Sequence, residues 1–184
     1  MSIDYFSILH KYVDPSSELY KIYVPHVTLV TNKALAIARR LDLSQDQQRF
    51  IEEAGYLHDI GVVKVKSEKL HTIGNLPYVC HGVEGNKILL DEGLPEHGLV
   101  AERHTGVGIT LQEIEARNLP LPRRDLVPQS LAEKIITYAD KFFSKRPESM
   151  WEAESVESIR TELAQYGQDR VAVFDEWHRQ FGGI

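Results

Sequence analysis

The sequence has few of the residues that mark several common protein classes. Its 184 residues contain one cysteine, Cys80, so an internal disulfide is excluded. No apolar run approaches the roughly 20 residues that span a bilayer, and the start MSIDYFSILHKYV lacks a basic region followed by an uninterrupted apolar stretch. The formal net charge of −6 disfavours a general role in binding nucleic-acid phosphates. We therefore expect a cytoplasmic protein without a nucleic-acid or membrane partner, and its oligomeric state stays open.

Strict alternation of apolar and polar residues, the pattern of a half-buried β-strand, is also missing. Helical spacing of apolar residues is common instead, as in residues 25–41, where Pro25 suits the first helical position and places His26 in the first turn. Two capping boxes, Ser44 with Gln47 and Ser130 with Glu133, mark the starts of two further helices. The sequence thus predicts an all-α fold, a compact helical bundle.

The remaining segments complete this prediction. We expect helices at 81–92 and 95–104, a helical C-terminal tail at 150–182, and two short helices in the first dozen residues and at Ser16 to Tyr23. Residues 62–80 show no sustained period and contain Gly74 and Pro77, so we interpret them as a long functional loop, and the proline-rich 117–129 as an irregular connection. With 42% hydrophobic residues the chain can bury one core, and we predict a single domain over residues 1–184.

Side chains that can bind metals stand near helix ends or at the rim of apolar stripes in five separate segments. Imidazole and carboxylate groups are ligands of divalent first-row metals, and the absence of cysteine ligands argues against a structural zinc site. Six ligands are too many for one metal that keeps an open position, but they suit two. The residues are His26, His58 with Asp59, His81, His104 and Asp140.

The order of these residues, with His58 and Asp59 inside the tetrapeptide HDIG, resembles the HD superfamily of metal-dependent phosphohydrolases. It is similar to the subset in which two added histidines bind a dinuclear centre. The strings CHGVEGNKIL, ERHTGVGIT and EKIITYADKF resemble a small, largely uncharacterised group of HDIG proteins. The resemblance covers about residues 20–145, so the C-terminal helices at 150–182 would pack on an HD-like core. One departure is that many members carry lysine directly after HDIG, whereas this chain has Val62.

The resemblance implies a role for each matching residue. Asp59 would bridge two divalent metal ions of iron, manganese, magnesium or zinc. His26, His58 and Asp140 would complete one metal site, and His81 with His104 the other. The implied enzyme is a hydrolase of a nucleotide-like phosphomonoester or phosphoanhydride that acts through a metal-bridging hydroxide.

Phosphoryl transfer also needs positive charge around the substrate. Lys64 is our first candidate, as a catalytic and substrate-binding residue, because it begins the loop that leaves His58 and Asp59. Lys66, Arg103 and Lys141 are further candidates for binding the substrate.

Four alternatives stay open or carry less weight. Dinuclear iron oxygenases acting on inositol or phosphonates share the six-ligand pattern, so ligands alone cannot separate them from hydrolases. A non-catalytic HD-like signalling module is disfavoured because such modules usually lack the ligands. Among hydrolases, the middle of the pattern resembles enzymes that split diadenosine tetraphosphate, although those commonly have alanine at Gly61, and the GYP tripeptide of cyclic dinucleotide hydrolases is missing after Asp59.

Overall fold

The computed structural model describes residues 3–146 and 148–182, and nearly all of its regular structure is helical. The α-helices within these residues are α1 (Tyr5–Tyr12), α2 (Glu18–Arg40), α3 (Gln45–Leu57), α4 (His81–Asp91), α5 (Pro95–Arg103), α6 (Leu111–Ala116), α7 (Leu131–Asp140), α8 (Val156–Ala164) and α9 (Gln168–Phe181). Short 3-10 helices cover Ile60–Lys64, Glu68–Leu70 and Tyr78–Cys80. The all-α prediction is confirmed.

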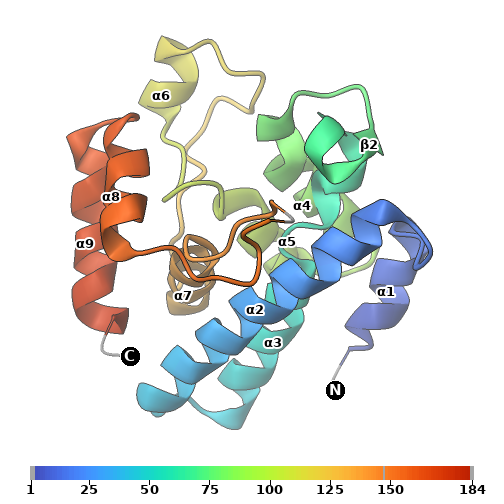
Figure 1. Cartoon of the computed structure of the whole chain (residues 1–184), viewed down its shortest axis with the longest axis horizontal. Helices are drawn as coiled ribbons and strands as arrows, with labels where there is room; N and C mark the ends of the chain where they lie inside the picture. The colour runs from blue at the N-terminus through green and yellow to red at the C-terminus, as the bar shows by residue number, and fades with distance from the viewer. Residues whose placement is uncertain (1–2, 147, 183–184) are drawn as a thin grey trace.

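The helices pack as pairs around α7 (Figure 1). Helices α2 and α3 run side by side, α4 packs on α5, and α8 packs on α9. The main hydrophobic cluster joins residues of α2, α7 and α9, such as Val30, Ile135 and Phe174, all of which are fully buried. The C-terminal helices therefore share a core with the earlier ones, and the assignment of the whole chain to one domain stays a prediction.

Helix α2 is longer than the sequence predicted. Pro25 was expected at its first position, after a separate short helix, but α2 begins at Glu18 and Pro25 lies inside it. Proline removes one intrahelical hydrogen bond and disturbs the turn before it. Burial on both sides of Pro25 offsets this effect, because Ile22 and Tyr23 are buried before it and Val27 after it. His26 consequently lies in the middle of a long helix and not in a first turn.

The two predicted capping boxes differ in outcome. At α3 the Ser44 side chain accepts a hydrogen bond from the Gln47 backbone, and the Gln47 side chain accepts one from the Ser44 backbone, as expected. At α7 Ser130 caps the Glu133 backbone. The Glu133 carboxylate instead accepts hydrogen bonds from the Arg103 guanidinium and from the Gln129 backbone, so the second box is only half formed.

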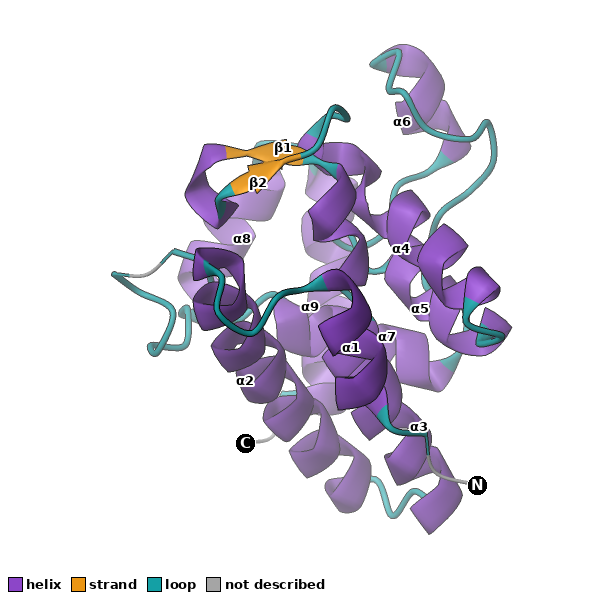
Figure 2. Cartoon of the chain, turned by 90° about the vertical axis from the view of Figure 1, so that its right-hand side faces the viewer, coloured by secondary structure: helices purple, strands orange, loops and turns teal. Residues whose placement is uncertain are grey.

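Residues 62–80 contain more regular structure than the predicted loop. The strands β1 (Lys66–Ser67) and β2 (Thr72–Ile73) pair antiparallel with Lys66 opposite Ile73. The hairpin lies at the opposite end of the molecule from the α2–α3 turn (Figure 2). Two-residue strands are too short to produce a readable alternation, which is why the sequence gave no signal for them. Helix α6 was likewise unpredicted, although Thr110 and Glu113 form a capping box there.

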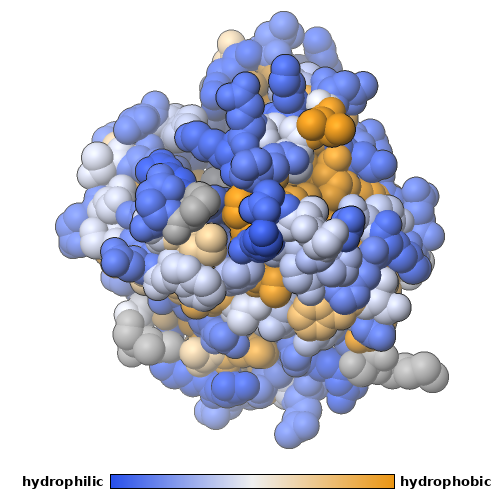
Figure 3. Space-filling model, turned by 45° about the vertical axis from the view of Figure 1, so that its right-hand side comes forward, coloured by the Kyte–Doolittle hydropathy of each residue, from blue (hydrophilic) through white to orange (hydrophobic). Residues whose placement is uncertain are grey.

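The surface agrees with the low hydropathy of the sequence. Figure 3 shows a face covered mostly by hydrophilic residues, with hydrophobic residues gathered in a strip at the upper right. Among the described residues, no helix is both long and apolar enough to cross a membrane.

Candidate metal centre

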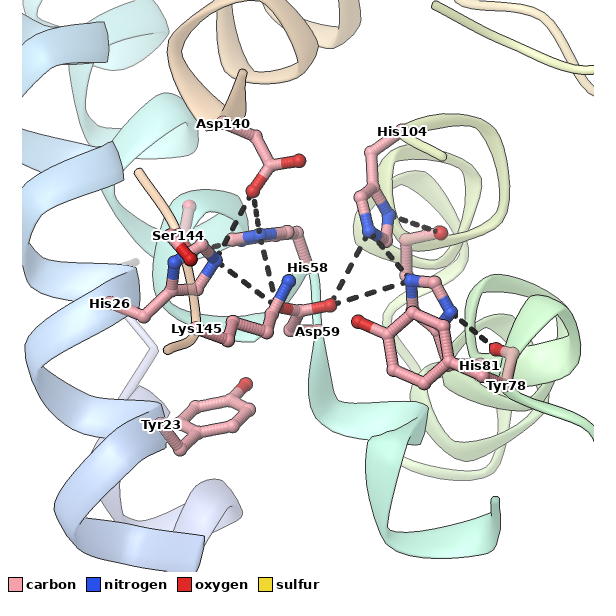
Figure 4. A network of polar contacts seen from close by, with 12 residues as sticks. Tyr23, His26, His58, Asp59, Tyr78, His81, His104, Asp140, Ser144 and Lys145 are labelled. Atoms are coloured by element: carbon pink, nitrogen blue, oxygen red, sulfur yellow. Dashed lines mark hydrogen bonds and ion pairs between the residues drawn. The ribbon is translucent and has the colours of Figure 1, made fainter. Parts of the chain in front are cut away.

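The six predicted ligands meet at one place in the interior (Figure 4). Each stands where a helix delivers it: His26 within α2, His58 and Asp59 directly after α3, and the others at the start of α4, just after α5 and at the end of α7. Exposure of these residues is 0% for His26, His58 and Asp59, 1% for His104, 3% for His81 and 9% for Asp140. Five segments far apart in sequence thus converge on one buried polar cluster.

Gly61 allows the HDIG segment to approach α4 closely. A methyl group at Gly61 would lie 2.0 Å from the backbone oxygen of His81 and 2.3 Å from the backbone nitrogen of Gly85. No atom fits at such distances, so only glycine allows this packing. The close contact brings the segment that carries Asp59 next to the start of α4, which carries His81.

Asp59 lies between two groups of histidines. Its Oδ2 atom is 3.2 Å from His26 Nε2 and 3.6 Å from His58 Nε2. Its Oδ1 atom is 3.5 Å from His81 Nε2 and 3.4 Å from His104 Nε2. The two oxygens of one carboxylate therefore face two different sets of ligands, which is the arrangement that a bridging carboxylate needs.

Asp140 belongs to the first of these sets. Its Oδ1 atom is 3.1 Å from His26 Nε2 and 3.6 Å from His58 Nε2. The ligand atoms of His26, His58 and Asp140 all lie within 4.8 Å of one another, and the same holds for those of His58, Asp59 and His104.

Backbone carbonyls fix the orientation of three of the histidine rings. The Nδ1 atoms of His58, His81 and His104 each lie 2.7 Å from the carbonyl oxygen of the residue three positions earlier. A carbonyl only accepts, so Nδ1 must carry the proton and donate. The lone pair of each neutral ring is then on Nε2, which points into the cluster, as in metal sites whose histidines are held by backbone carbonyls.

Burial and neighbouring charges set the protonation states. Burial raises the pKa of Asp59, but Lys145 and His58 outweigh it and hold that pKa well below its usual range. Lys145 and His26 do the same for the pKa of Asp140. Burial, reinforced by the adjacent His104, lowers the pKa of His81 to about 3. Ionised carboxylates and neutral imidazoles are the forms that bind metals.

The pKa values of His104 and His58 are shifted in opposite directions. Burial lowers the pKa of His104, with Asp59 opposing. Burial would also lower the pKa of His58, but the Asp59 and Asp140 carboxylates outweigh it and raise that pKa. The environment of His58 thus favours a positive charge, which a metal ion would supply.

Unpaired buried atoms provide the test of whether cations fit. Within residues 3–146 and 148–182, no hydrogen-bond partner exists for either ring nitrogen of His26, for His58 Nε2, for Asp59 Oδ1 or for Asp140 Oδ1, and Asp59 Oδ2 forms an ion pair with Lys145 at 2.7 Å. His81 Nε2 and His104 Nε2 also face each other at 3.0 Å. Buried polar atoms without partners are costly, and cations between these atoms would satisfy them. The donor set therefore fits divalent metals.

The sequence did not identify Lys145, which lies at this centre. It follows α7, and its Nζ atom is 2.7 Å from Asp59 Oδ2 with the side chain 20% exposed. Burial opposes its charge, but Asp59 and Tyr78 outweigh it and raise the pKa of Lys145 well above its usual value. Lys145 belongs to no recognisable motif, and only its position five residues after Asp140 places it near the site.

Tyr78 contacts His81 at this centre. Its ring stacks on that of His81 with 4.6 Å between centroids, and its backbone carbonyl accepts the His81 Nδ1 hydrogen bond. The stacked ring fixes the plane of His81 and lines the same cavity as Lys145.

A cavity of about 660 Å³ opens from the metal centre, within the size range of small-molecule sites. His81, His104, Asp140 and Lys145 line its inner end. Although the whole chain carries a net charge of −6, six lysine and arginine residues line this cavity against four acidic ones. The cavity therefore favours an anionic ligand.

The predicted substrate-binding cations divide between two locations. Lys141 lines the cavity. Lys64, Lys66 and Arg103 are not among the described residues that line it. Lys64 and Lys66 are exposed, because Val62 and Val65 occupy the buried positions of that segment. Arg103 turns to Glu133 instead, at 3.0 Å. For these three residues the contact with substrate stays a prediction.

Sequence comparisons find relatives in archaea. The chain is 32% identical over 124 residues to a tRNA (cytidine(56)-2'-O)-methyltransferase of Picrophilus torridus, which covers 67% of this chain and 32% of that protein. It is 42% identical over 103 residues to the uncharacterised protein MJ0778 of Methanocaldococcus jannaschii, covering 53% and 59%. The chain thus spans about a third of the methyltransferase and over half of MJ0778.

Two solved structures share the fold. The HD domain of the L. monocytogenes phosphodiesterase PgpH aligns with a TM-score of 0.57 at 15% identity, over 96% of this chain and 88% of that one. The same domain in complex with cyclic-di-AMP aligns with a TM-score of 0.54, also at 15% identity, over 97% and 87%. The HD domain family model matches residues 23–144, which include all six candidate ligands. The chain belongs to the HD domain family.

Proposed function

We propose that this protein is a metal-dependent phosphohydrolase that cleaves a phosphomonoester or phosphoanhydride bond of a nucleotide-like molecule. The observation that carries the proposal is the position of Asp59, whose two oxygens face separate histidine sets at the inner end of a positively lined cavity. Family membership supports the same reaction class.

The ligands would divide between two ions. His26, His58 and Asp140 would hold one ion together with Asp59 Oδ2, and His81 with His104 would hold the other together with Asp59 Oδ1. When bound, divalent ions supply an activated water nucleophile and positive charge for the phosphoryl oxygens. The protein contributes fixed Nε2 lone pairs, ionised carboxylates and a centre shielded from bulk water.

We assign to Lys145 the phosphate-binding role first predicted for Lys64. Lys145 contacts Asp59 and also lines the cavity, so its long side chain can reach a phosphoryl group beside the metals. A fixed cation stabilises the charge that phosphoryl transfer spreads over the equatorial oxygens. Lys141, next to Asp140, adds positive charge to the same cavity.

A nucleotide-like substrate fits the cavity and the fold. The PgpH HD domain was crystallised with cyclic-di-AMP, so this fold can hold a nucleotide in that protein. In this chain the support is the size of the cavity and its positive lining. The methyltransferase name belongs to proteins of which this chain spans about a third, and we do not assign methyl transfer to the shared segment.

The decisive experiment measures phosphate release and oxygen consumption together. Protein loaded with manganese, magnesium, zinc or iron is incubated with nucleoside mono-, di- and triphosphates, dinucleoside polyphosphates and cyclic dinucleotides. We expect phosphomonoester or phosphoanhydride cleavage, seen as free phosphate or nucleotide products, without oxygen uptake, also under anaerobic conditions. Oxygen-coupled loss of substrate with iron alone would overturn the proposal in favour of an oxygenase. His10→Gln, which changes an exposed histidine on α1, is the control variant and should behave as the wild type.

A further inference from the structure

We propose that the outer end of the cavity is a nucleobase-binding subsite built by Arg117 and Tyr166. This inference rests on the proposed function, because it places the phosphate of the substrate at the metal centre and its base at the opposite wall. It narrows the substrate class from nucleotide-like anions to compounds that carry a purine or pyrimidine ring.

The two residues lie next to each other at the cavity wall. Arg117 follows α6 and Tyr166 follows α8, and the guanidinium carbon lies over the tyrosine ring, 5.4 Å from its centre. Both side chains line the cavity that also contains His81 and His104. Arg117 is half exposed and Tyr166 is 54% exposed, so a ligand can reach both side chains.

Apolar residues also line this cavity. Leu163 is 4% exposed, and Ile109 and Leu119 are partly buried; all three line the cavity. A wall of this kind would serve a purely phosphorylated sugar poorly, because sugar hydroxyls need polar partners. A planar heterocycle suits it, since base rings stack on aromatic and guanidinium planes and tolerate apolar surroundings.

A buried ion pair holds the two sides of the subsite together. Arg170 of α9 is 7% exposed; it pairs with Glu113 of α6 and donates a hydrogen bond of 3.0 Å to the backbone oxygen of Gly108. These contacts join α6 to the α8–α9 pair, so Arg117 and Tyr166 keep their relative positions without a ligand. A subsite formed in advance loses less entropy when it binds.

Part of the subsite lies outside the matched family region. All six candidate ligands and Arg117 lie within the matched region 23–144, whereas Leu163, Tyr166 and Arg170 follow it. The helices after the matched region therefore provide the Tyr166 side of the subsite. We infer that the metal centre sets the reaction and that this C-terminal side of the cavity helps to select the substrate.

The test compares two ligands that differ by the base. Adenosine 5′-monophosphate and ribose 5-phosphate are titrated calorimetrically into the full chain freed of metal by a chelator, so binding is measured without hydrolysis. We expect the nucleotide to bind at least about tenfold more tightly, the range of one stacked base. Equal affinities would overturn the inference.

Variants locate the difference at Tyr166. Tyr166→Ala should remove the preference for the nucleotide while leaving ribose 5-phosphate binding unchanged, and Tyr166→Phe should keep the preference because the ring is retained. Trp151→Ala changes an exposed aromatic of the C-terminal segment that is not among the described residues of this cavity, and it should have no effect. A Tyr166→Ala variant that weakens both ligands equally, or neither, would refute the base subsite.

The two proposals fail in different ways. A base preference without any hydrolysis would refute the phosphohydrolase and keep the subsite. Hydrolysis of ribose 5-phosphate with the same kcat/KM as the nucleotide, unaffected by Tyr166→Ala, would keep the phosphohydrolase and refute the subsite.

Discussion

Two places in this molecule bring histidine and carboxylate side chains together in the interior. At the first, Glu53 accepts hydrogen bonds from His97, at 3.3 Å, and from the Ile3 backbone, at 3.0 Å. At the second, both oxygens of Asp59 face histidine nitrogens; Oδ1 lacks a hydrogen-bond partner within the described part of the chain, and Oδ2 pairs with Lys145 at 2.7 Å. Burial is similar, since Glu53 is 6% exposed and Asp59 0%.

The difference lies in how the buried polar atoms are satisfied. The Glu53 pair uses its protein partners fully, so it needs no ligand and serves to dock the N-terminal segment on α3 and α5. In the Asp59 cluster many acceptor atoms point to the same places, and there are too few hydrogen-bond donors for all of them. Buried unsatisfied polar groups require an explanation, and bound cations provide one here.

The largest expected effect comes from Asp59→Asn. An amide has one oxygen and cannot accept at both sides, so both metal sites lose a charged ligand. Loss of a residue that only orients a metal ligand lowers activity by up to about 100-fold. Because Asp59 would itself be a ligand, we expect phosphohydrolase activity to fall by more than that. Metal analysis and steady-state kinetics of the purified variant measure this effect.

Glu53→Gln is the matched change at the other cluster. It should lower the melting temperature and leave metal content and kcat nearly unchanged, because Glu53 contacts none of the six ligands among the hydrogen bonds and ion pairs of the described residues. If Glu53→Gln removed metal while Asp59→Asn did not, the assignment of the two clusters would be reversed.

Gly61→Ala should have the next largest effect. The added methyl group would lie 2.0 Å from the His81 backbone oxygen, so the 3-10 segment and α4 must move apart. We expect a loss of about 1 to 3 kcal/mol of stability, the usual effect of overpacking, together with weaker binding of the metal held by His81 and His104. Denaturant unfolding and metal titration check both effects.

Gly93→Ala provides a contrasting glycine variant. No atom lies within 4 Å of a methyl group at Gly93, but the backbone φ of +76° at this position is strained for any residue that has a side chain. The variant should lose stability without losing metal. Equal metal affinity in Gly61→Ala and wild type would contradict the proposed role of the close contact.

Lys145→Ala should impair turnover while both metals stay bound. A hydrogen bond to a charged group is worth about 1.5 to 3 kcal/mol, so kcat/KM should fall about 10- to 100-fold. Lys145→Arg should restore part of it, because the charge is kept. Metal analysis must show unchanged occupancy for this interpretation.

Lys64→Ala decides between the two lysines. An unchanged rate in Lys64→Ala and a reduced one in Lys145→Ala would support Lys145 as the phosphate-binding residue. The opposite result would restore the role that the sequence first predicted for Lys64.

The sequence predicted much of the fold because its signals are local. The capping box at Ser44 and the helical spacing around Val30 describe their own segments, and the structure agrees with them. Pro25 misled the prediction because its local effect is offset by burial of Ile22 and Val27 against distant residues. The hairpin at Lys66 and Ile73 is too short to show a period.

The residues of the candidate site also divide into those that a sequence pattern reveals and those that only the fold reveals. His58 and Asp59 could be found because a short motif carries them, and the other ligands because their order matches a family. Lys145 could not be found, since its contact with Asp59 depends on how the chain turns after α7. Lys64 adjoins the motif in sequence, yet its side chain is exposed.

The smallest expected effect concerns pH at the Glu53 pair. Burial lowers the pKa of His97 below 6.5, although Glu53 opposes this. Below pH 6.5 the unfolded chain therefore binds more protons than the folded one, and stability falls as the pH falls. The melting temperature should drop about 2 to 4 °C for each kcal/mol lost between pH 7 and pH 5.

His97→Gln tests the source of this loss, because glutamine does not titrate. His81 and His104, whose pKa values are also lowered, contribute with the same sign, and His58, whose pKa is raised, contributes with the opposite sign. The variant should therefore lose less stability than the wild type between pH 7 and pH 5. Activity at pH 7 should stay within about twofold of the wild type, since a satisfied buried pair that contacts none of the six candidate ligands in the described part of the chain contributes to folding alone. Equal losses of stability in both proteins would mean that the pKa of His97 is not lowered as its surroundings dictate. A loss of activity would mean that the Glu53 pair affects the Asp59 cluster, which would contradict the distinction between them.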